Sequence, residues 1–185
     1  MNGRVRWTWG VATVMALVLS QGGWAAEEGR QAASEPDYES IAGLITGLYE
    51  SVSFDPGETP DWNLVRSFFL PEAVVVFAAR GSRPTQVMDL DGFIADFVTF
   101  YDDADIATRG FWETVAGTEV VLYGNIAHAF VVFEPRRGPE RDGPTTPGID
   151  SLELVQHDGR WWVAAITTQF SSDELPIPTR FLEGS

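Results

Sequence analysis

Apolar residues recur at helical spacing in three segments of the first hundred residues. One stripe repeats every three to four positions and comprises Ile41, Leu44, Ile45, Leu48, Tyr49 and Val52. Shorter stripes follow in residues 60–69, behind Pro60, and in residues 89–101, behind Asp89 or Asp91. A helix on the surface of a domain buries one apolar face at this period. The pattern therefore predicts three amphipathic helices, the first of them capped by Ser34 or Asp37.

From Gly110 onward the pattern changes to that of strands. Two strand pairs close on tight turns, one around Gly124-Asn125 and the other around Asp158-Gly159. Asp-Gly tolerates the positive φ that a two-residue hairpin requires. Short strands are also expected at Ala73 to Ala79 and at 85–88. The order predicts an α+β domain in which three N-terminal helices wrap a curved, antiparallel or mixed sheet.

Both faces of the late strands are apolar. Ile126, Phe130 and Val132 point to one face, whereas Ala127, Ala129, Val131 and Phe133 point to the other. An antiparallel sheet with one wet face would alternate apolar with polar residues. Something must therefore cover each face: the helices cover one, and a second subunit or the C-terminal tail covers the other. We expect a homodimer.

The N-terminus has the pattern of a secretory signal. Arg4 and Arg6 precede an apolar run to Leu19, and small residues surround a cleavage site after Ala25. An uncleaved membrane anchor is the alternative, but the run falls short of the roughly 20 apolar residues that a span needs. The expected organisation is a signal peptide at 1–25, a flexible leader at 26–35 and one domain at 36–183. The protein is then periplasmic or secreted, with no membrane contact after cleavage.

The charge is strongly negative, at −15, and all twelve basic residues are arginines. Removal of Arg4 and Arg6 would lower the net charge to −17. Such a surface repels phosphate backbones and anionic lipids, so nucleic acid and membrane partners are not expected. An acidic surface serves solubility, and a site for a cationic ligand is the alternative. The absence of cysteine excludes disulfides, a cysteine nucleophile and thiolate metal sites.

Several segments of this chain resemble the nuclear transport factor 2-like superfamily, the cone-shaped α+β fold of SnoaL-like cyclases and ketosteroid isomerases. The resemblance covers 37–182 and implies that fold for the chain. Because this fold hosts isomerases, dehydratases, cyclases, hydrolases and binding modules, the resemblance implies no single activity. The similar segments are 61–73, 124–136, 158–163 and 175–182, the last resembling the end of uncharacterised SnoaL-like exported proteins.

The catalytic residues of the isomerase branch do not carry over to this chain. That branch has a general-base aspartate in its first strand, where this chain has Val76 or Phe77. Tyr49 falls in a different register from the branch's helix tyrosine. The aspartate of its later strand would align near Asp150 or Ser151. Ketosteroid isomerase chemistry is therefore not expected.

Three side chains are candidates for acid–base chemistry. His128 stands inside a predicted strand, where it could transfer protons near neutral pH or serve as a hydrogen-bonded core or interface residue. Glu113 and Glu153 interrupt apolar strands. A carboxyl group that faces a pocket has a raised pKa and can shuttle protons, whereas one at a strand edge pairs with an arginine.

The aromatic residues of the predicted elements would line the hollow between sheet and helices, or else fill it as core. They are Tyr49, Trp62, Phe77, Phe97, Tyr101, Trp112, Phe130 and Trp161. A lining of this kind suits a small apolar or aromatic molecule. Asp102, Asp103 and Asp105 lack the spacing of an EF-hand and are expected in a solvated loop, so neither a metal nor a cofactor is predicted.

Three functions remain open from the sequence. The first is a small-molecule-binding module whose catalytic set is incomplete. The second is a cofactor-free lyase, isomerase or cyclase that uses His128 with Glu113 or Glu153. The third is a protein-interaction module that docks through the sheet face.

Overall fold

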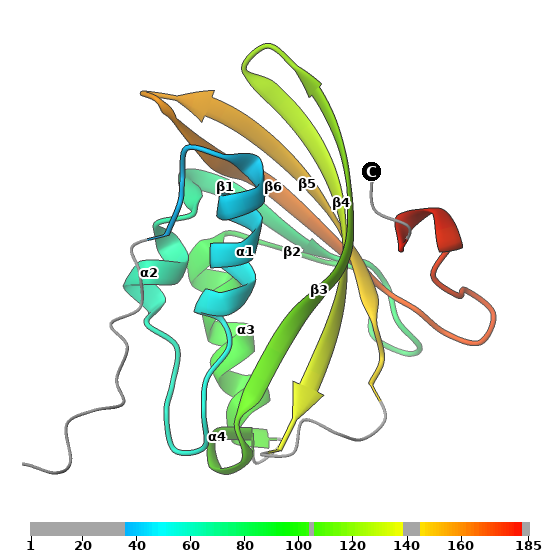
Figure 1. Ribbon diagram of the computed structural model, residues 1–185. Coiled ribbons are helices and arrows are strands. Elements are labelled where there is room, and N and C mark those ends of the chain that lie inside the picture. The colour runs from blue at the N-terminus through cyan, green and yellow to red at the C-terminus, as the bar shows by residue number, and fades with distance from the viewer. Residues whose placement is uncertain (1–35, 104–105, 139–144, 183–185) are drawn as a thin grey trace, which may run out of the picture. The chain divides into compact units, whose positions relative to one another are not determined.

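A computed structural model of the protein describes residues 36–103, 106–138 and 145–182 (Figure 1). The described residues fall in one compact unit that begins at Glu35. The predicted signal peptide at 1–25 and leader at 26–35 lie outside the described residues, so export stays a prediction.

One six-stranded sheet forms the framework of this unit. Its strand order is β2-β1-β6-β5-β4-β3, and all neighbouring strands are antiparallel except β1 and β6, which run parallel. The α+β class and the mixed, helix-wrapped sheet are therefore confirmed. The elements are α1 (Ile41–Ser51), α2 (Trp62–Arg66), β1 (Phe69–Phe77), β2 (Gln86–Met88), α3 (Leu90–Asp103), α4 (Ile106–Arg109), β3 (Phe111–Tyr123), β4 (Ile126–Arg137), β5 (Gly148–His157), β6 (Arg160–Phe170) and a 3-10 turn η1 (Thr179–Phe181).

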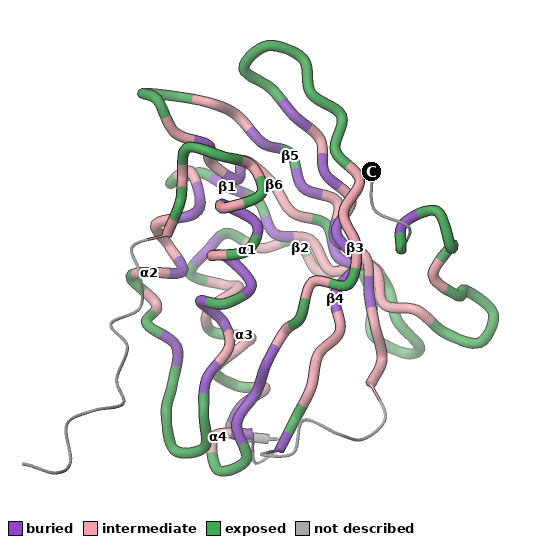
Figure 2. The backbone as a smooth tube through the Cα atoms, in the orientation of Figure 1, coloured by how far each residue is buried: buried purple, intermediate pink, exposed green. Residues whose placement is uncertain are grey.

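The helices α1, α2 and α3 lie against one face of the sheet, which we call the inner face (Figure 1). On β4 this face carries Ala127, Ala129, Val131 and Phe133, all buried. The apolar stripe of α1 packs against them, with Leu44 and Leu48 buried. Burial is accordingly concentrated between helices and sheet (Figure 2). Apolar burial on this scale is the main stabilising term of such a domain.

Side-chain caps fix where the first two helices begin. The Ser40 side chain accepts a hydrogen bond from the Gly43 backbone N–H at 3.0 Å, and α1 begins at Ile41. Asp37, one of the two predicted caps, instead accepts hydrogen bonds from the Glu39 N–H and the Ser40 hydroxyl just before the helix. In the same way, the side chain of Asp61 caps α2. Each such cap satisfies a backbone N–H that the helix leaves free.

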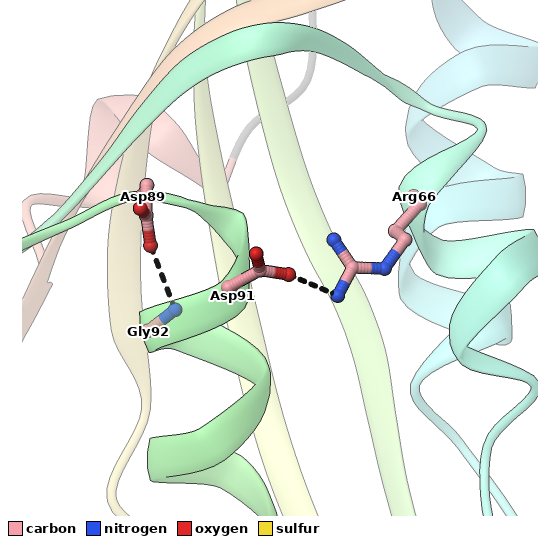
Figure 3. Close-up of polar contacts among 4 residues, drawn as sticks. All are labelled: Arg66, Asp89, Asp91 and Gly92. Carbon is pink, nitrogen blue, oxygen red and sulfur yellow. Dashed lines mark hydrogen bonds and ion pairs between the residues drawn. The ribbon is translucent and has the colours of Figure 1, made fainter.

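Helix α3 is fixed at its start by two carboxylates (Figure 3). Asp89 accepts a hydrogen bond from the Gly92 N–H at 2.8 Å. Asp91 pairs with Arg66 at the end of α2, which ties the two helices together. The sequence predicted a loop from Tyr101 to Asp105, but α3 continues through Asp103. These contacts hold the aromatic face of α3 against the sheet.

Pro71 lies within β1, which begins before Ala73, the start that the sequence predicts for this strand. Helix α2 ends at Arg66, and β1 begins at Phe69. The pairing of β1 with β6 shifts register between Phe69 and Val74. A proline has no N–H to give to a ladder, so a strand accepts it at such an irregularity.

A second irregularity changes which residues of β6 face the helices. The β5–β6 pairing shifts between Glu153 and Leu154. Val163 pairs with the inner-facing Leu154, whereas Ala165 pairs with Glu153 on the outer face. In a strand without a bulge, Val163 and Ala165 would lie on the same face. One extra residue at a bulge reverses the alternation.

The C-terminal segment covers part of the outer face. Phe181 is buried against Phe130, with ring centroids 5.1 Å apart. It crosses β3 at Gly117, where an added Cβ would lie 2.0 Å from the Phe181 carbonyl oxygen. The tip of the β3–β4 hairpin remains bare, with Val121 and Ile126 exposed at 65% and 59%. The homodimer stays a prediction.

Candidate functional site

A pocket of about 950 Å³ lies between the inner face of the sheet and helices α1 and α3. Its closed end is formed by α1, through Leu48, Tyr49 and Val52. Its wide end is formed by the β1–β2 loop, the end of α4 and the end of β4. A volume of this size holds a small organic ligand.

The walls of the pocket are aromatic. Nine rings contribute to them: Tyr49, Phe69, Phe77, Phe93, Phe97, Phe100, Phe111, Phe133 and Phe170. Many of these rings meet edge to face, as do Phe97 and Phe111 at 5.7 Å between centroids. Edge-to-face contacts fix ring orientation and add to the stabilisation from burial. The walls are therefore held in place by the ring contacts themselves.

Asp150 is a buried carboxylate of β5, and two hydroxyls contact it. The Tyr49 hydroxyl donates to Oδ2 and the Thr168 hydroxyl donates to Oδ1, each at 2.6 Å. Strand pairing brings Thr168 beside Asp150, and helix α1 supplies Tyr49 from above the sheet. Burial raises the pKa of Asp150 to about 6, although the two hydrogen bonds act in the opposite direction. Burial and then Asp150 raise the pKa of Tyr49 well above its usual value.

Glu113 of β3 also faces the pocket. Its backbone N–H donates to the Ser53 hydroxyl at 3.0 Å, and the adjoining Phe54 pairs with Phe111, so the start of β3 is firmly placed. Burial and then the Asp150 carboxylate raise the pKa of Glu113 to about 8. The accessible part of the Glu113 side chain faces the pocket, and protein surrounds that pocket. Within the described residues, no group hydrogen-bonds to its carboxyl.

The two carboxyl groups titrate on either side of neutral pH. Between about pH 6 and pH 8 the pair holds one proton, with Asp150 ionised and Glu113 protonated. Neighbouring acids whose pKa values are pushed apart can work as base and acid at one pH. Glu113 can then donate a hydrogen bond to a ligand oxygen, and Asp150 can accept a proton.

His128 and Glu153, the other two predicted catalytic residues, lie on the outer face and outside this pocket. They pair with each other across β4 and β5, with His128 Nδ1 2.8 Å from Glu153 Oε1. The side chain of Glu153 is 62% exposed. Glu113 is thus separated by the sheet from both of the residues with which it was grouped, and no shared site joins the three.

The eight predicted pocket aromatics divide into four groups. Tyr49, Phe77 and Phe97 line the pocket. Trp62 and Tyr101 stand behind Phe97, with ring centroids 5.9 and 5.0 Å from it. Trp112 and Phe130 occupy the opposite face of the sheet, since alternate residues of a strand point to opposite sides. Trp161 is buried in the core without lining the pocket.

Sequence reasoning missed the central role of Asp150 and Thr168. Both lie in strands whose inner face is otherwise apolar. A single acidic residue among apolar neighbours could have identified Asp150 from the sequence. It also missed the gathering of arginines at the wide end, because Arg80, Arg109 and Arg137 come from segments far apart in the sequence.

A second hollow, of about 810 Å³, lies on the other side of β6 beneath the C-terminal segment. It is more open and is lined by exposed polar residues such as Ser172 and Glu174. Perturbed acids in an enclosed site are the better indicator of function. The inner pocket is therefore the candidate site.

The described part of the chain holds no group of three or more metal-ligating side chains, and none of its helices is long and apolar enough to cross a membrane. The inner pocket supplies hydroxyls, carboxyls, guanidinium groups and aromatic rings. Its chemistry is therefore that of hydrogen bonding, charge and proton transfer.

Solved structures of other proteins share this fold. An NTF2-like protein with a cystatin-like fold from Novosphingobium aromaticivorans matches with a TM-score of 0.56 and 13% identity, over 75% of this chain and 86% of that one. A protein of unknown function with a cystatin-like fold from Nostoc punctiforme matches with a TM-score of 0.54 and 12% identity, over 74% and 91%. A protein from N. aromaticivorans named as a candidate scytalone dehydratase matches with a TM-score of 0.53 and 12% identity, over 71% and 82%.

No protein-family model and no curated protein matches the sequence. The predicted resemblance to the nuclear transport factor 2-like superfamily is confirmed at the level of the fold. Identities this low show the fold alone, so function has to be argued from the pocket.

Proposed function

We propose that this chain, which has the nuclear transport factor 2-like fold, binds a small and largely apolar molecule in its inner pocket. One observation carries the proposal: an aromatic-walled pocket of about 950 Å³ encloses a carboxyl group, that of Glu113, which no described residue hydrogen-bonds. A ligand atom that pairs with Glu113 would supply the hydrogen bond that no described residue gives to this carboxyl group.

The mode of binding follows from the pocket's chemistry. Phe93, Phe97 and Phe133 would contact an apolar ring system. Protonated Glu113 would donate a hydrogen bond to a carbonyl or hydroxyl oxygen of the ligand. Burial of the ring supplies most of the affinity, and the single polar contact sets orientation.

A direct test is titration with N-phenylnaphthylamine, a neutral dye whose fluorescence rises in apolar surroundings. We expect saturable binding of one dye per pocket. Ile166→Trp, which adds bulk at a pocket-lining residue, should weaken that binding strongly. The matched control is Val121→Trp on the exposed outer face, which should bind like the unchanged protein. Equal binding by both variants would place the dye elsewhere, and no binding would contradict the proposal.

A second candidate function is cofactor-free proton transfer, as in a lyase or isomerase. The observation that favours it is that two carboxyl groups, those of Asp150 and Glu113, line the same pocket, where burial raises the pKa of both. Asp150 would remove a proton from the carbon beside a carbonyl group while Glu113 donates a hydrogen bond to the carbonyl oxygen, giving an enolate. In a β,γ-unsaturated ketone, Asp150 would return that proton to the γ carbon, which completes a shift of the double bond. In a β-hydroxy ketone, Asp150 would give the proton to the β-hydroxyl, which leaves as water and completes a dehydration.

Hydrogen–deuterium exchange into cyclic ketones tests this chemistry without knowledge of the substrate. We expect the protein to accelerate exchange beside the carbonyl in heavy water, as followed by NMR. Glu113→Gln and Asp150→Asn should each abolish the acceleration. His128→Ala should leave it intact, since His128 lies outside the pocket. Exchange that survives both pocket substitutions would rule out this assignment.

A further inference from the structure

The wide end of the inner pocket is rich in arginine, although the chain as a whole has a net charge of −15. Five of the eight arginines that the structure describes line this pocket. They come from three separate segments, namely the β1–β2 loop, the end of α4 and the end of β4. We call them the arginine rim: Arg80, Arg83, Arg109, Arg136 and Arg137.

Most of the rim lacks a neutralising partner. Arg136 pairs with Glu134 at 2.6 Å. Arg80, Arg83, Arg109 and Arg137 form no ion pair with any described residue. One carboxylate on α3, that of Asp96, also borders the pocket, and the rim outnumbers it. Counted over the described residues, the wide end therefore carries more positive than negative charge.

Two rim guanidinium groups are held against aromatic rings. The Arg80 Cζ lies 4.5 Å from the centroid of the Phe170 ring, and the Arg137 Cζ lies 5.0 Å from that of Phe100. Such stacking restrains a guanidinium group while leaving its N–H donors available at the edge. A pre-oriented donor fork suits an oxyanion such as a carboxylate.

Two rim arginines come from one tight loop. Arg80 and Arg83 stand opposite each other between β1 and β2, joined by two backbone hydrogen bonds of 3.0 Å. This loop therefore brings two arginines to one edge of the pocket.

Strand register places the rim close to the buried acids. On the inner face, Phe111 pairs with Arg137, and the next inner pair along the ladder is Glu113 with Pro135. Two residues of a strand span about 7 Å. A molecule with its charged group on the rim would therefore lay its ring system against the aromatic walls and bring a neighbouring atom to Glu113.

We propose that the pocket selects an organic anion, a molecule with an apolar ring body and one oxyanion group that binds the arginine rim. This inference rests on the proposed function, because it names the class of ligand for the same pocket. The acidic remainder of the surface repels anions, so a preference for an anion has to arise at the rim. The ligand is thus amphipathic rather than wholly apolar.

Two dyes with the same aromatic body separate charge from hydrophobicity. Anilinonaphthalene sulfonate is an anion, whereas N-phenylnaphthylamine is its neutral counterpart. We expect the unchanged protein to bind the anionic dye about tenfold more tightly or better, equivalent to about 1.4 kcal/mol. Raising the salt from about 50 mM to about 500 mM should weaken the anionic dye alone, because salt screens the rim.

Variants then assign the preference to the rim. Arg83→Gln, in an exposed loop, and Arg137→Gln should each lower the affinity for the anionic dye several-fold and leave the neutral dye unchanged. Arg66→Gln is the matched control, since Arg66 pairs with Asp91 between α2 and α3 and does not line the pocket. Arg66→Gln should keep the preference for the anion.

Each result of the dye titrations either supports or contradicts the proposed preference for an anion. Equal affinity for both dyes, or an anion preference that survives both Arg83→Gln and Arg137→Gln, overturns this inference and leaves the proposed function standing. Binding of neither dye defeats the proposed function, and the inference falls with it. The salt titration needs no variant, so a rim substitution that prevents folding does not affect that part of the test.

Discussion

The hydroxyl of Tyr49 and the carboxylate of Asp150 are 2.6 Å apart, which makes a buried hydrogen bond between helix α1 and strand β5. The two residues are 101 positions apart in the chain. This contact fixes the helix over the sheet and forms the closed end of the inner pocket. It therefore links the stability of the domain to the geometry of the candidate site.

Tyr49→Phe should destabilise the protein by about 1–3 kcal/mol, because it leaves one oxygen of buried Asp150 without its donor. The same change should raise the pKa of Asp150 further, since the hydrogen bond from Tyr49 lowers that pKa. Urea unfolding at neutral pH measures the loss. Tyr38→Phe is the control: its hydroxyl contacts Ser67 in a partly exposed position, so the loss should be smaller. Equal losses would contradict this interpretation.

Stability should fall as the pH rises toward 8, and Glu113→Gln should reduce that fall. The pKa of Glu113 is raised from 4.5 to about 8, so between these values the folded state holds a proton that the unfolded state has released. Folded stability then decreases with pH across this window, by an amount on the order of a few kcal/mol. Urea unfolding from pH 5 to pH 9 would show a shallower slope for the variant. Glu153→Gln, at an exposed site, should retain the slope of the unchanged protein.

His128→Ala should change stability by less than about 1 kcal/mol, because solvent reaches both members of the His128–Glu153 pair, whose side chains are 30% and 62% exposed. Binding of N-phenylnaphthylamine should be unchanged, since neither residue borders the inner pocket. Thermal unfolding and dye titration on one preparation provide both values. A loss of dye binding similar to that of Ile166→Trp would show that the outer face contributes to the site after all.

Gly117→Ala should release the C-terminal segment from the outer face. The added Cβ would lie 2.0 Å from the Phe181 carbonyl oxygen, which is much closer than atoms can approach. Faster proteolysis or amide exchange around Phe181 is the expected result. Ala116→Ser, at the exposed neighbouring position, serves as the control and should leave the segment protected. Unchanged protection in Gly117→Ala would contradict the packing described above.

We also propose that two copies associate through the bare β3–β4 hairpin, where Tyr123 and Ile126 are 83% and 59% exposed. Light scattering at micromolar concentration should then give twice the mass of one chain. Ile126→Asp should shift the protein to a single chain, because a charge cannot be buried cheaply in an apolar contact. Glu119→Asp, which keeps the charge on the same strand, should remain dimeric. A single-chain mass for the unchanged protein would remove the proposal.

Much of the fold could be predicted from local pattern. The stripe from Ile41 to Val52 is α1, and the turns at Gly124-Asn125 and Asp158-Gly159 both close hairpins. Asp158 and Gly159 have φ values of 52° and 79°, the left-handed conformation expected of that pair. The start of β1 could not be predicted, because Pro71 lies inside the strand. The face on which Ala165 lies could not be predicted either, because one residue inserted at a bulge reverses the face of every residue after it.

The site could be predicted only in part, because it depends on register between distant strands. Glu113 was identified from its isolation in an apolar strand, and it does face the pocket. His128 is likewise isolated in an apolar strand, but its side chain lies on the opposite face of the sheet. Nothing in the local sequence says which face the helices cover. Asp150 gains its role from Tyr49 and Thr168, which strand order and helix packing bring to it.

The parallel pairing of β1 with β6 has a consequence for how the chain acquires its structure during synthesis. β6 follows the other five described strands in the sequence, yet it lies between β1 and β5 in the sheet. Before β6 is made, β1–β2 and β3–β5 each have an open edge where β6 will pair. The sheet is therefore completed only after β6 has been made.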